Sequence, residues 1–187
     1  MGMLDNKVAI VTGGAQGIGR GCVERFVREG AAVVIGDVRD EAGEQLAQAC
    51  RASGGRALFQ HAEVSRSDEF KALVERAVKE FGRLDVLLNN AAVAGPYGPI
   101  EQVPEEDWNL CIGITLKSVF LGMKYAIPEL RKSGGGAIIS ISSGAAIRSE
   151  PFLHAYSAAK AAIINLSQGV AATVGQDRIR VNCICPG

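Results

Sequence analysis

The sequence lacks an excess of charge of either sign. Lysine plus arginine and aspartate plus glutamate number 20 each, so the formal net charge at pH 7 is zero. Proteins that bind nucleic acid or an anionic membrane surface usually carry a basic excess, because phosphate groups attract cations. The composition therefore predicts no nucleic acid and no membrane among the partners of this chain.

Long apolar stretches are also lacking near the N-terminus. Asp5 stands early, and only the five-residue run VAIVT at 8–12 follows it. A secretory signal or a membrane span requires a longer apolar segment. There is no internal repeat, low-complexity tract or linker, and 48% of the 187 residues are apolar. We therefore expect residues 1–187 to form a single domain with a sizeable core.

The cysteines lack the CxxC spacing of metal sites. The five cysteines are Cys22, Cys50, Cys111, Cys183 and Cys185. An odd number without such spacing is typical of reduced thiols, so the sequence predicts a cytoplasmic location and no metal. Cys183 and Cys185 stand two apart in an expected strand, where buried packing thiols are the simplest interpretation.

Short apolar runs rich in β-branched residues alternate with segments of helical periodicity. Strands are expected at 8–12, 32–37, 57–64, 85–90, 137–142 and 180–185. Helices are expected near 18–29, 40–53, 67–82, 105–131 and 153–174. Strands that are apolar throughout are buried on both faces, which is typical of a parallel sheet covered by helices. The pattern predicts an α/β fold with a doubly wound, Rossmann-like parallel sheet that binds its ligand at the carboxyl ends of the strands.

A glycine-rich turn follows the first expected strand. Residues 12–21 read TGGAQGIGRG, in which Gly13, Gly17 and Gly19 have the spacing G-x-x-x-G-x-G. Glycines let the backbone turn sharply and approach a pyrophosphate, whose charge then lies at the N-terminus of the next helix. The turn predicts a dinucleotide site that also includes Gln16 and Ile18. A glycine-rich turn without a ligand is the alternative interpretation.

The second expected strand ends in Asp37. A carboxylate at this place accepts hydrogen bonds from the adenosine ribose hydroxyls and repels a 2′-phosphate, which favours NAD over NADP. Gln16 supplies no compensating cation, although Arg39 lies nearby. A surface turn acid without a ligand is the alternative interpretation of Asp37.

The stretch HAYSAAK at 154–160 places Tyr156 and Lys160 four residues apart with only small residues between them. On an α-helix this spacing puts both side chains on one face, about 6 Å apart along the axis. Taken alone, the pair also fits an ordinary helix whose tyrosine and lysine extend to solvent. Its meaning depends on the other motifs of the chain.

Five ordered motifs together resemble those of the short-chain dehydrogenase/reductase family. They are TGGAQGIG at 12–19, NNAA at 89–92, ISS at 141–143, YSAAK at 156–160 and RVNCICPG at 180–187. The resemblance implies a Rossmann-like sheet and the NAD(P)-linked oxidation of alcohols or reduction of carbonyls. It also implies a dimer or a tetramer.

The resemblance implies roles for the catalytic residues. Tyr156 is expected to act as the general acid/base, and Lys160 to bind the nicotinamide ribose and favour the ionised tyrosine. Ser143, thirteen residues before Tyr156, is expected to hydrogen-bond the substrate oxygen. Its neighbour Ser142 is the alternative, since serines at strand ends often only cap backbone.

The cofactor cleft is implied by two further motifs. Asn90 and Ala91 are expected to line it, and Pro186 and Gly187 to flank the nicotinamide. Both Tyr156 and Lys160 also belong to this expected cofactor site.

Three positions depart from the usual family pattern. HAEV places Glu63, which is followed by the expected cofactor residue Val64, where an aspartate usually binds the adenine amino group, and NNAA has Ala92 in place of glycine. Thr115 stands where an asparagine usually helps to hold a water of the proton relay. A threonine hydroxyl donates once and accepts twice, so we expect a weakened relay at Thr115.

The sequence stops at Gly187, directly after the last motif. Family members usually continue with a substrate-covering loop, a helix and a seventh strand. We therefore expect the domain to be C-terminally incomplete, with 180–185 as an exposed edge strand.

The leading hypothesis is an oxidoreductase that transfers a hydride between NAD and a secondary alcohol or ketone. A 3-oxoacyl-thioester reductase that uses NADPH is a second hypothesis, and a weakly active cofactor-binding or scaffold protein is a third.

The helix expected near 153–174 is unusual, because residues 161–176 carry no charge. We expect this helix to pack partly on the sheet and partly on another subunit, together with the helix near 105–131.

Overall fold

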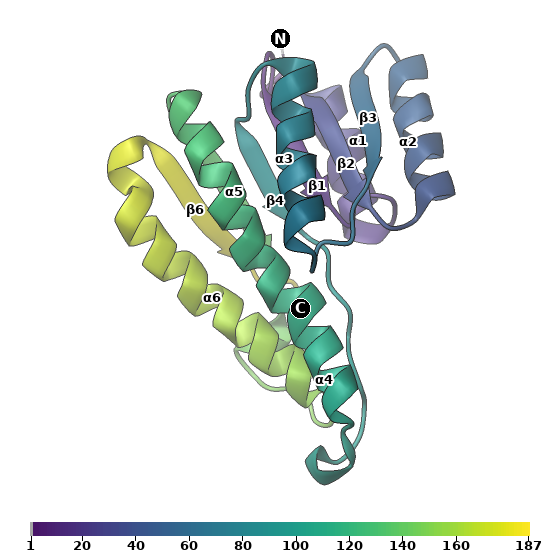
Figure 1. Cartoon of the computed structure of the whole chain (residues 1–187), viewed down its shortest axis with the longest axis vertical. Coiled ribbons are helices and arrows are strands. Elements are labelled where there is room, and N and C mark those ends of the chain that lie inside the picture. Colours follow the sequence, from purple (N-terminus) through teal and green to yellow (C-terminus); the bar gives the residue numbers. More distant parts are fainter. Residues whose placement is uncertain (1) are drawn as a thin grey trace.

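In the computed structural model, which describes residues 2–187, six strands form one sheet (Figure 1). Neighbouring strands run parallel in the order β3-β2-β1-β4-β5-β6. This arrangement confirms the predicted doubly wound, Rossmann-like sheet. The strands are β1 (Val8–Thr12), β2 (Ala32–Asp37), β3 (Arg56–His61), β4 (Val86–Asn89), β5 (Gly136–Ile141) and β6 (Ile179–Ile184).

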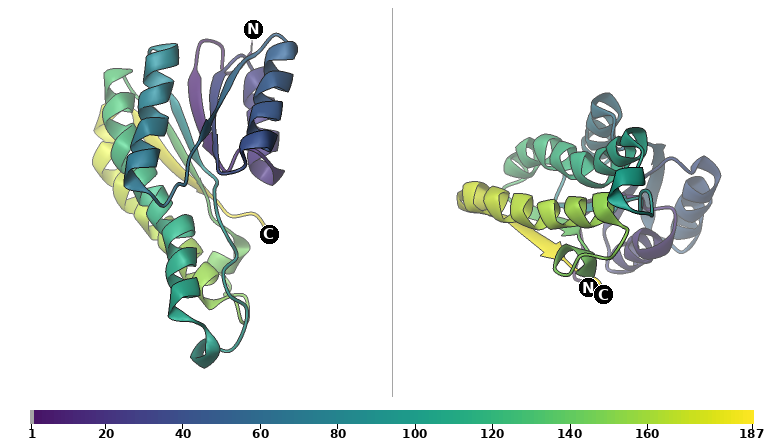
Figure 2. Two further views of the ribbon diagram at one scale, coloured as in Figure 1. Left: turned by 45° about the vertical axis from the view of Figure 1, so that its right-hand side comes forward. Right: turned by 90° about the horizontal axis from the view of Figure 1, so that it is seen from below.

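Helices cover both faces of the sheet (Figure 2). They are α1 (Gly17–Arg28), α2 (Asp40–Ala52), α3 (Ser67–Phe81), α4 (Glu105–Ile112), α5 (Ser118–Lys132) and α6 (His154–Val174). The core on one face includes side chains of α1 and α2, and the core on the other includes side chains of α3, α5 and α6. Two separate cores explain why the central strands are apolar on both faces.

Strand β1 shows how the sequence produces these two cores. Its five residues are all buried. Successive side chains of a strand point to opposite faces, so Val8 and Ile10 join the core under α3 and α5, while Ala9 and Val11 join the core under α1 and α2. A polar residue at any of these four positions would therefore be buried in a core.

Strand β3 is shorter than the sequence predicted. It was expected to reach residue 64, but it ends at His61. The chain leaves the sheet after Ala62, whose N–H still donates to the carbonyl oxygen of Asp37 (3.0 Å). Ala62 and Val64 are buried because their side chains join the core under α3 and α5, so their apolar character did not mark a strand.

The expected helix 105–131 is interrupted. A π-helical turn, Gly113–Lys117, separates α4 from α5. Such turns place an extra residue in the helical path and often occur at functional sites. By length and composition the run Glu105–Lys132 passes as a membrane span, but α5 buries Val119, Leu121 and Met123 in the core of this domain.

The strand order reverses between β1 and β4, which lie side by side in the middle of the sheet. From this point β2 and β3 extend to one side and β5 and β6 to the other. The loops after β1 and β4 therefore diverge and leave room between them, as in other doubly wound sheets. Within the described residues β6 is an edge strand, as expected, and Ile184 near its end is 51% exposed.

Candidate functional site

The turn between β1 and α1 brings backbone N–H groups to the carboxyl edge of the sheet. Gly13 and Gly17 have φ values of 61° and 53°, a region that glycine adopts most readily. A Cβ atom on Gly19 would lie 2.1 Å from the carbonyl oxygen of Gly13, so α1 approaches the turn this closely only because residue 19 is glycine. Gln16, which precedes α1, makes no side-chain cap hydrogen bond. The first N–H groups of α1 are thus left for an anion.

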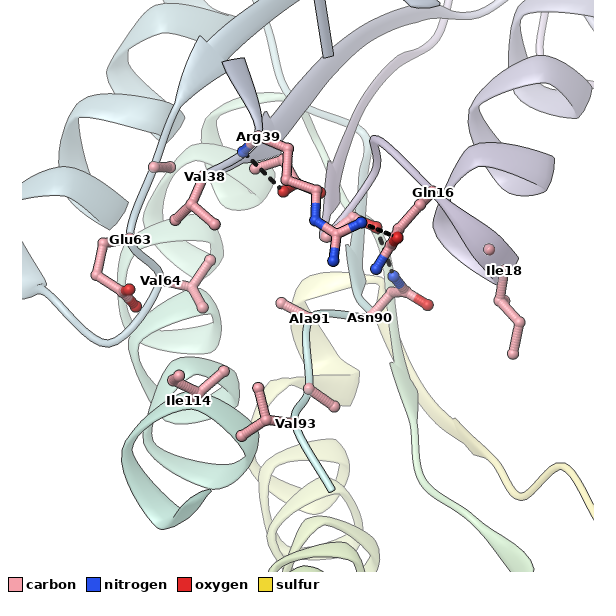
Figure 3. A pocket seen from close by; sticks show the side chains of 15 residues that line it. Gln16, Ile18, Val38, Arg39, Glu63, Val64, Asn90, Ala91, Val93 and Ile114 are labelled. Carbon is pink, nitrogen blue, oxygen red and sulfur yellow. Dashed lines mark hydrogen bonds between the residues drawn. The ribbon is translucent and has the colours of Figure 1, made fainter. Parts of the chain in front are cut away.

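A pocket of about 320 Å³ opens beside this turn (Figure 3). Its walls come from the loops that follow β1, β2, β3 and β4, together with the π-helical turn. Pockets of this size and position hold small ligands and cofactors. Nine of the predicted cofactor residues line it: Gly13, Gln16, Gly17, Ile18, Asp37, Glu63, Val64, Asn90 and Ala91.

Asp37 lies at one end of the pocket and is only 7% exposed. Its carboxylate accepts hydrogen bonds from the backbone N–H groups of Ala15 (3.0 Å) and Arg39 (3.1 Å). The guanidinium of Arg39 extends over the pocket and donates to the side-chain oxygen of Gln16 (Figure 3). A carboxylate and a guanidinium therefore share this end of the pocket.

Asn90 connects the two loops of the switch point. Its side-chain amide donates to the carbonyl oxygens of Thr12 and Gly13, both at 3.0 Å. Its backbone N–H donates to the hydroxyl of Thr12 (3.1 Å). Asn90 therefore holds the glycine turn in place, and it leads the chain into Ala91 and the pocket wall.

Glu63 lies in the wall formed after β3. Its carboxylate accepts hydrogen bonds from the backbone N–H (3.2 Å) and the hydroxyl (3.0 Å) of Ser65. The longer side chain, compared with the aspartate usual in the family, thus bonds to its own loop. Val64, the next residue, lines the same wall of the pocket (Figure 3).

Tyr156 and Lys160 share one face of α6, as their spacing predicted. The Lys160 Nζ lies 5.3 Å from the centroid of the Tyr156 ring. The same nitrogen donates a hydrogen bond to the carbonyl oxygen of Ile141 at the end of β5 (2.7 Å). Lys160 does not extend to solvent, since it is only 2% exposed. Its ammonium is therefore held between the sheet and the phenol.

Burial changes the chemistry of this lysine. Loss of hydration lowers the pKa of Lys160 to about 8, from the usual 10.5. At neutral pH the side chain is mostly protonated.

The two serines after β5 differ in what they contact. The hydroxyl of buried Ser142 donates to the backbone carbonyl of Lys160 (2.8 Å) and so anchors α6 on the sheet. The half-buried Ser143 has a hydroxyl oxygen that accepts from the N–H of Ala145 (3.1 Å), which leaves its own hydrogen free to donate. Ser143 therefore stays the predicted contact of the substrate oxygen.

The end of the chain lies beside Ser143. The N–H of Gly144 donates to the carbonyl oxygen of Pro186 (2.7 Å), and a Cβ atom on Gly144 would lie 3.6 Å from the Cα of Gly187. Pro186 and Gly187 therefore stand next to the predicted catalytic residues, outside the set that lines the pocket.

Thr115 occupies the centre of the π-helical turn and is fully buried. Its hydroxyl donates to the carbonyl oxygen of Val93 (3.1 Å) and accepts from the N–H of the same residue (3.2 Å). Cys111 on α4 donates a weak hydrogen bond to the same carbonyl (3.6 Å), and burial raises the pKa of its thiol. Thr115 thus holds the loop after β4, and one lone pair of its hydroxyl remains free.

Some pocket residues were missed by sequence reasoning. Val38, Ala62, Val93 and Ile114 line the pocket but belong to no family motif. Their nearest signal is adjacency to a predicted residue, since Val38 follows Asp37 and Ile114 precedes Thr115. Among residues 2–187, no cluster of His, Cys, Asp or Glu has the arrangement of a metal site.

Comparison with known proteins identifies the family of this chain. The sequence model of the family described as short chain dehydrogenase matches residues 7–187. The chain is 41% identical to a cis-4-hydroxycyclohexanecarboxylate dehydrogenase of Sinomonas cyclohexanicum, over 97% of this chain and 72% of that protein. It is 40% identical to a 2,5-dichloro-2,5-cyclohexadiene-1,4-diol dehydrogenase of Sphingobium indicum, over 98% of this chain and 73% of that protein. It is also 40% identical to (+)-borneol dehydrogenase 2 of Salvia officinalis, over 96% of this chain and 64% of that protein.

Proposed function

Because the chain belongs to the short-chain dehydrogenase family of oxidoreductases, we propose that it transfers a hydride between NAD and a secondary alcohol or ketone. The observation that carries the proposal is the buried Lys160, which lies against the Tyr156 ring and next to the strand end that bears Ser143. A lysine that served only to solubilise a helix would extend into water.

The residues present fit a dinucleotide. Gly13 and Gly19 allow close backbone packing in the turn, and Gly17 leaves open space where a pyrophosphate would lie. The uncapped start of α1 offers N–H groups, and Asp37 offers acceptors for ribose hydroxyls. Glu63, Val64, Asn90 and Ala91 would complete the adenosine side of this site. When bound, the nicotinamide supplies the hydride acceptor or donor.

The protein would handle the proton. In the oxidative direction the Tyr156 phenolate takes the proton of the substrate hydroxyl. In the reductive direction the Tyr156 phenol donates a proton to the substrate oxygen. Ser143 donates its free hydrogen to the substrate oxygen, since its own oxygen is already bonded to the Ala145 N–H. The Lys160 ammonium would stabilise negative charge on the phenol oxygen, and its N–H groups beyond the one that binds Ile141 would be donors for the nicotinamide ribose.

Thr115 would act mainly by position. Its donor and one acceptor are used by Val93, which lines the pocket, so it sets this wall of the site. A relay water at Thr115 would depend on the single remaining lone pair of the hydroxyl.

Oligomerisation is proposed from the outer face of α6. The helix carries no charged residue from Ala161 to Val174, and several of its exposed positions are small or uncharged, such as Ala161 and Ala172. Phe120 on the neighbouring α5 is 49% exposed. Such a face suits contact with a second copy, in a homodimer or homotetramer. Sedimentation as a monomer at micromolar concentration would contradict this.

A screen of NAD and NADP with secondary alcohols and ketones tests the proposed function. We expect turnover with NAD, at a kcat/KM about tenfold or more above that with NADP, because like charges at Asp37 and a 2′-phosphate repel. Binding of NADH without turnover of any substrate would favour a scaffold protein. A preference for NADPH with 3-oxoacyl thioesters would favour the reductase. The free cysteines agree with a cytoplasmic setting for this chemistry.

Two substitutions at the same end of the pocket test the cofactor preference. Asp37→Asn removes the charge but keeps an oxygen for the Ala15 N–H, so it should raise kcat/KM with NADP by at least about tenfold. Arg39→Ala is the matched control and should lower any residual NADP activity, because it removes the cation near the 2′ position. An unaltered NAD/NADP ratio in Asp37→Asn would remove Asp37 from the ribose site.

A further inference from the structure

The loop between β5 and α6 contains a turn in which Phe152 occupies a position that favours glycine. The N–H of Leu153 donates to the carbonyl oxygen of Glu150 (3.2 Å), so Pro151 and Phe152 are the central residues. Phe152 has a φ of 65°. Proline followed by a positive φ is the pattern of a type II turn, whose second central residue is usually glycine or asparagine. A bulky side chain there is strained, which points to a use for its ring.

The ring of Phe152 meets that of Tyr97 in the loop after β4. The ring centroids are 5.5 Å apart and the planes are inclined by 58°, a favourable aromatic arrangement. Beside the rings, the N–H of Gly98 donates to the carbonyl oxygen of Phe152 (3.1 Å). The aromatic pair therefore joins two loops that are separated by more than fifty residues in the sequence.

The loops that carry the pair meet near the start of α6, the helix that bears the predicted catalytic tyrosine. Phe152 lies two residues before the start of α6 and four before Tyr156. In the other loop, a Cβ atom on Gly95 would lie 3.9 Å from the Cβ of Ala155, the residue before Tyr156. Both loops leave the carboxyl ends of their strands at the lower part of the molecule in Figure 1.

Both rings keep large exposed surfaces. Tyr97 is 72% exposed and Phe152 is 43% exposed. The exposure of adjacent aromatic rings to water is unfavourable, and binding of an apolar group would remove this cost. Rigid aromatic side chains are also efficient binding surfaces, because they lose little conformational entropy on contact.

We propose that Tyr97 and Phe152 form an aromatic wall of the substrate site, and that the substrate is a secondary alcohol carried on an apolar ring. This inference rests on the proposed function, because the wall gains its meaning from the neighbouring Tyr156. A rigid ring presents a broad apolar face to the wall and loses few rotamers on binding, whereas a small acyclic alcohol would cover less of the two rings.

Ketone binding in the presence of oxidised NAD tests the wall without turnover, since neither compound can then donate a hydride. The dissociation constants of cyclohexanone and of butanone would be measured by saturation-transfer NMR for three proteins: wild type, Phe152→Gly and Phe152→Tyr. We expect Phe152→Gly to weaken cyclohexanone binding about tenfold and to leave butanone within about twofold. Phe152→Tyr keeps a ring and should bind cyclohexanone as the wild type does.

The unfolding midpoint separates a site effect from a folding defect. Glycine adopts the positive φ without strain, so Phe152→Gly should unfold at the same or a higher temperature than the wild type. Phe152→Asn, which also tolerates this backbone conformation, should reproduce the loss of cyclohexanone affinity.

Three results would overturn the wall. The first is that the wild type does not bind cyclohexanone, and the second is that Phe152→Gly loses affinity equally for both ketones. The third is that Phe152→Gly binds both ketones as the wild type does but has an altered sedimentation coefficient, which would assign the rings to a contact between copies of the chain. Failure of the proposed function looks different. Cyclohexanone binding that depends on Phe152, without any oxidation of cyclohexanol by NAD, would support the wall and reject the dehydrogenase chemistry.

Discussion

Replacing Tyr156 by phenylalanine is expected to lower kcat by about 10²–10⁴-fold, the usual contribution of a general acid/base. The ring remains, so the 5.3 Å contact with the Lys160 ammonium and the packing of α6 persist. What disappears is the hydroxyl that exchanges a proton with the substrate oxygen. Steady-state kinetics with NAD and a secondary alcohol would measure the loss, and NADH titration would show a nucleotide affinity within about twofold of the wild type.

Tyr125→Phe is the matched control for this substitution. The Tyr125 hydroxyl bonds to Ser67 (2.5 Å) between α5 and α3, and neither residue lines the pocket. Tyr125→Phe also removes a phenolic oxygen, but it should leave kcat unchanged. Retained turnover in Tyr156→Phe would reject Tyr156 as the base and direct attention to another proton donor beside Ser143.

The second large effect concerns Lys160 and the pH dependence of stability. Burial lowers the pKa of Lys160 to about 8 in the folded protein, while in the unfolded chain it stays near 10.5. Between these values the unfolded chain binds more protons than the folded one, so the free energy of unfolding should rise with pH through this window. A difference of 2.5 units, at 1.36 kcal/mol each, corresponds to about 3 kcal/mol in total.

Lys160→Met should remove this rise, because methionine does not titrate. Urea unfolding of both proteins at several pH values from 7 to 10.5 would show it. The stability of the wild type relative to the variant should increase by about 3 kcal/mol across the window. Near pH 7 the two should be closer, because the variant loses the hydrogen bond to Ile141 but avoids the buried charge.

The same variant tests function. Without the ammonium, negative charge on the Tyr156 oxygen is less stable, so kcat should fall. The nicotinamide ribose would also lose a hydrogen-bond donor, so the NAD dissociation constant should rise. Lys124→Met on α5 is the control, since that lysine is exposed and lies over aromatic rings. Parallel pH dependences for the wild type and Lys160→Met would show that Lys160 does not titrate in this window.

The sequence was sufficient for the strand–helix alternation, because burial on two faces imposes an apolar pattern that is visible along the chain. The run VAIVT at 8–12 became β1 with the predicted bounds. The apolar pattern was less reliable as a sign of a strand where residues are buried outside the sheet. Ala62 and Val64 follow the end of β3, and their side chains join the core and line the pocket. Apolar character alone does not distinguish a strand from a buried turn.

Local spacing also predicted which residues would gather at the candidate site. Gly13, Gly17 and Gly19 form the turn, and Tyr156 and Lys160 share a helical face, because both relations depend on a few consecutive backbone angles. The interruption at Thr115 was not predicted. A π turn differs from an α-helix by one residue of hydrogen-bond register, and no residue type in GITLK marks that shift.

What the sequence by itself determined is thus the order of the elements, the two-sided core and the short motifs, since each follows from neighbours along the chain. Only the tertiary structure decided what the side chains contact. It paired Thr115 with Val93, 22 positions away, brought Tyr97 to Phe152, and placed the Arg39 guanidinium beside Gln16. Such pairs form where distant loops meet at one edge of the sheet. Their geometry depends on strand order and helix packing, which no local pattern encodes.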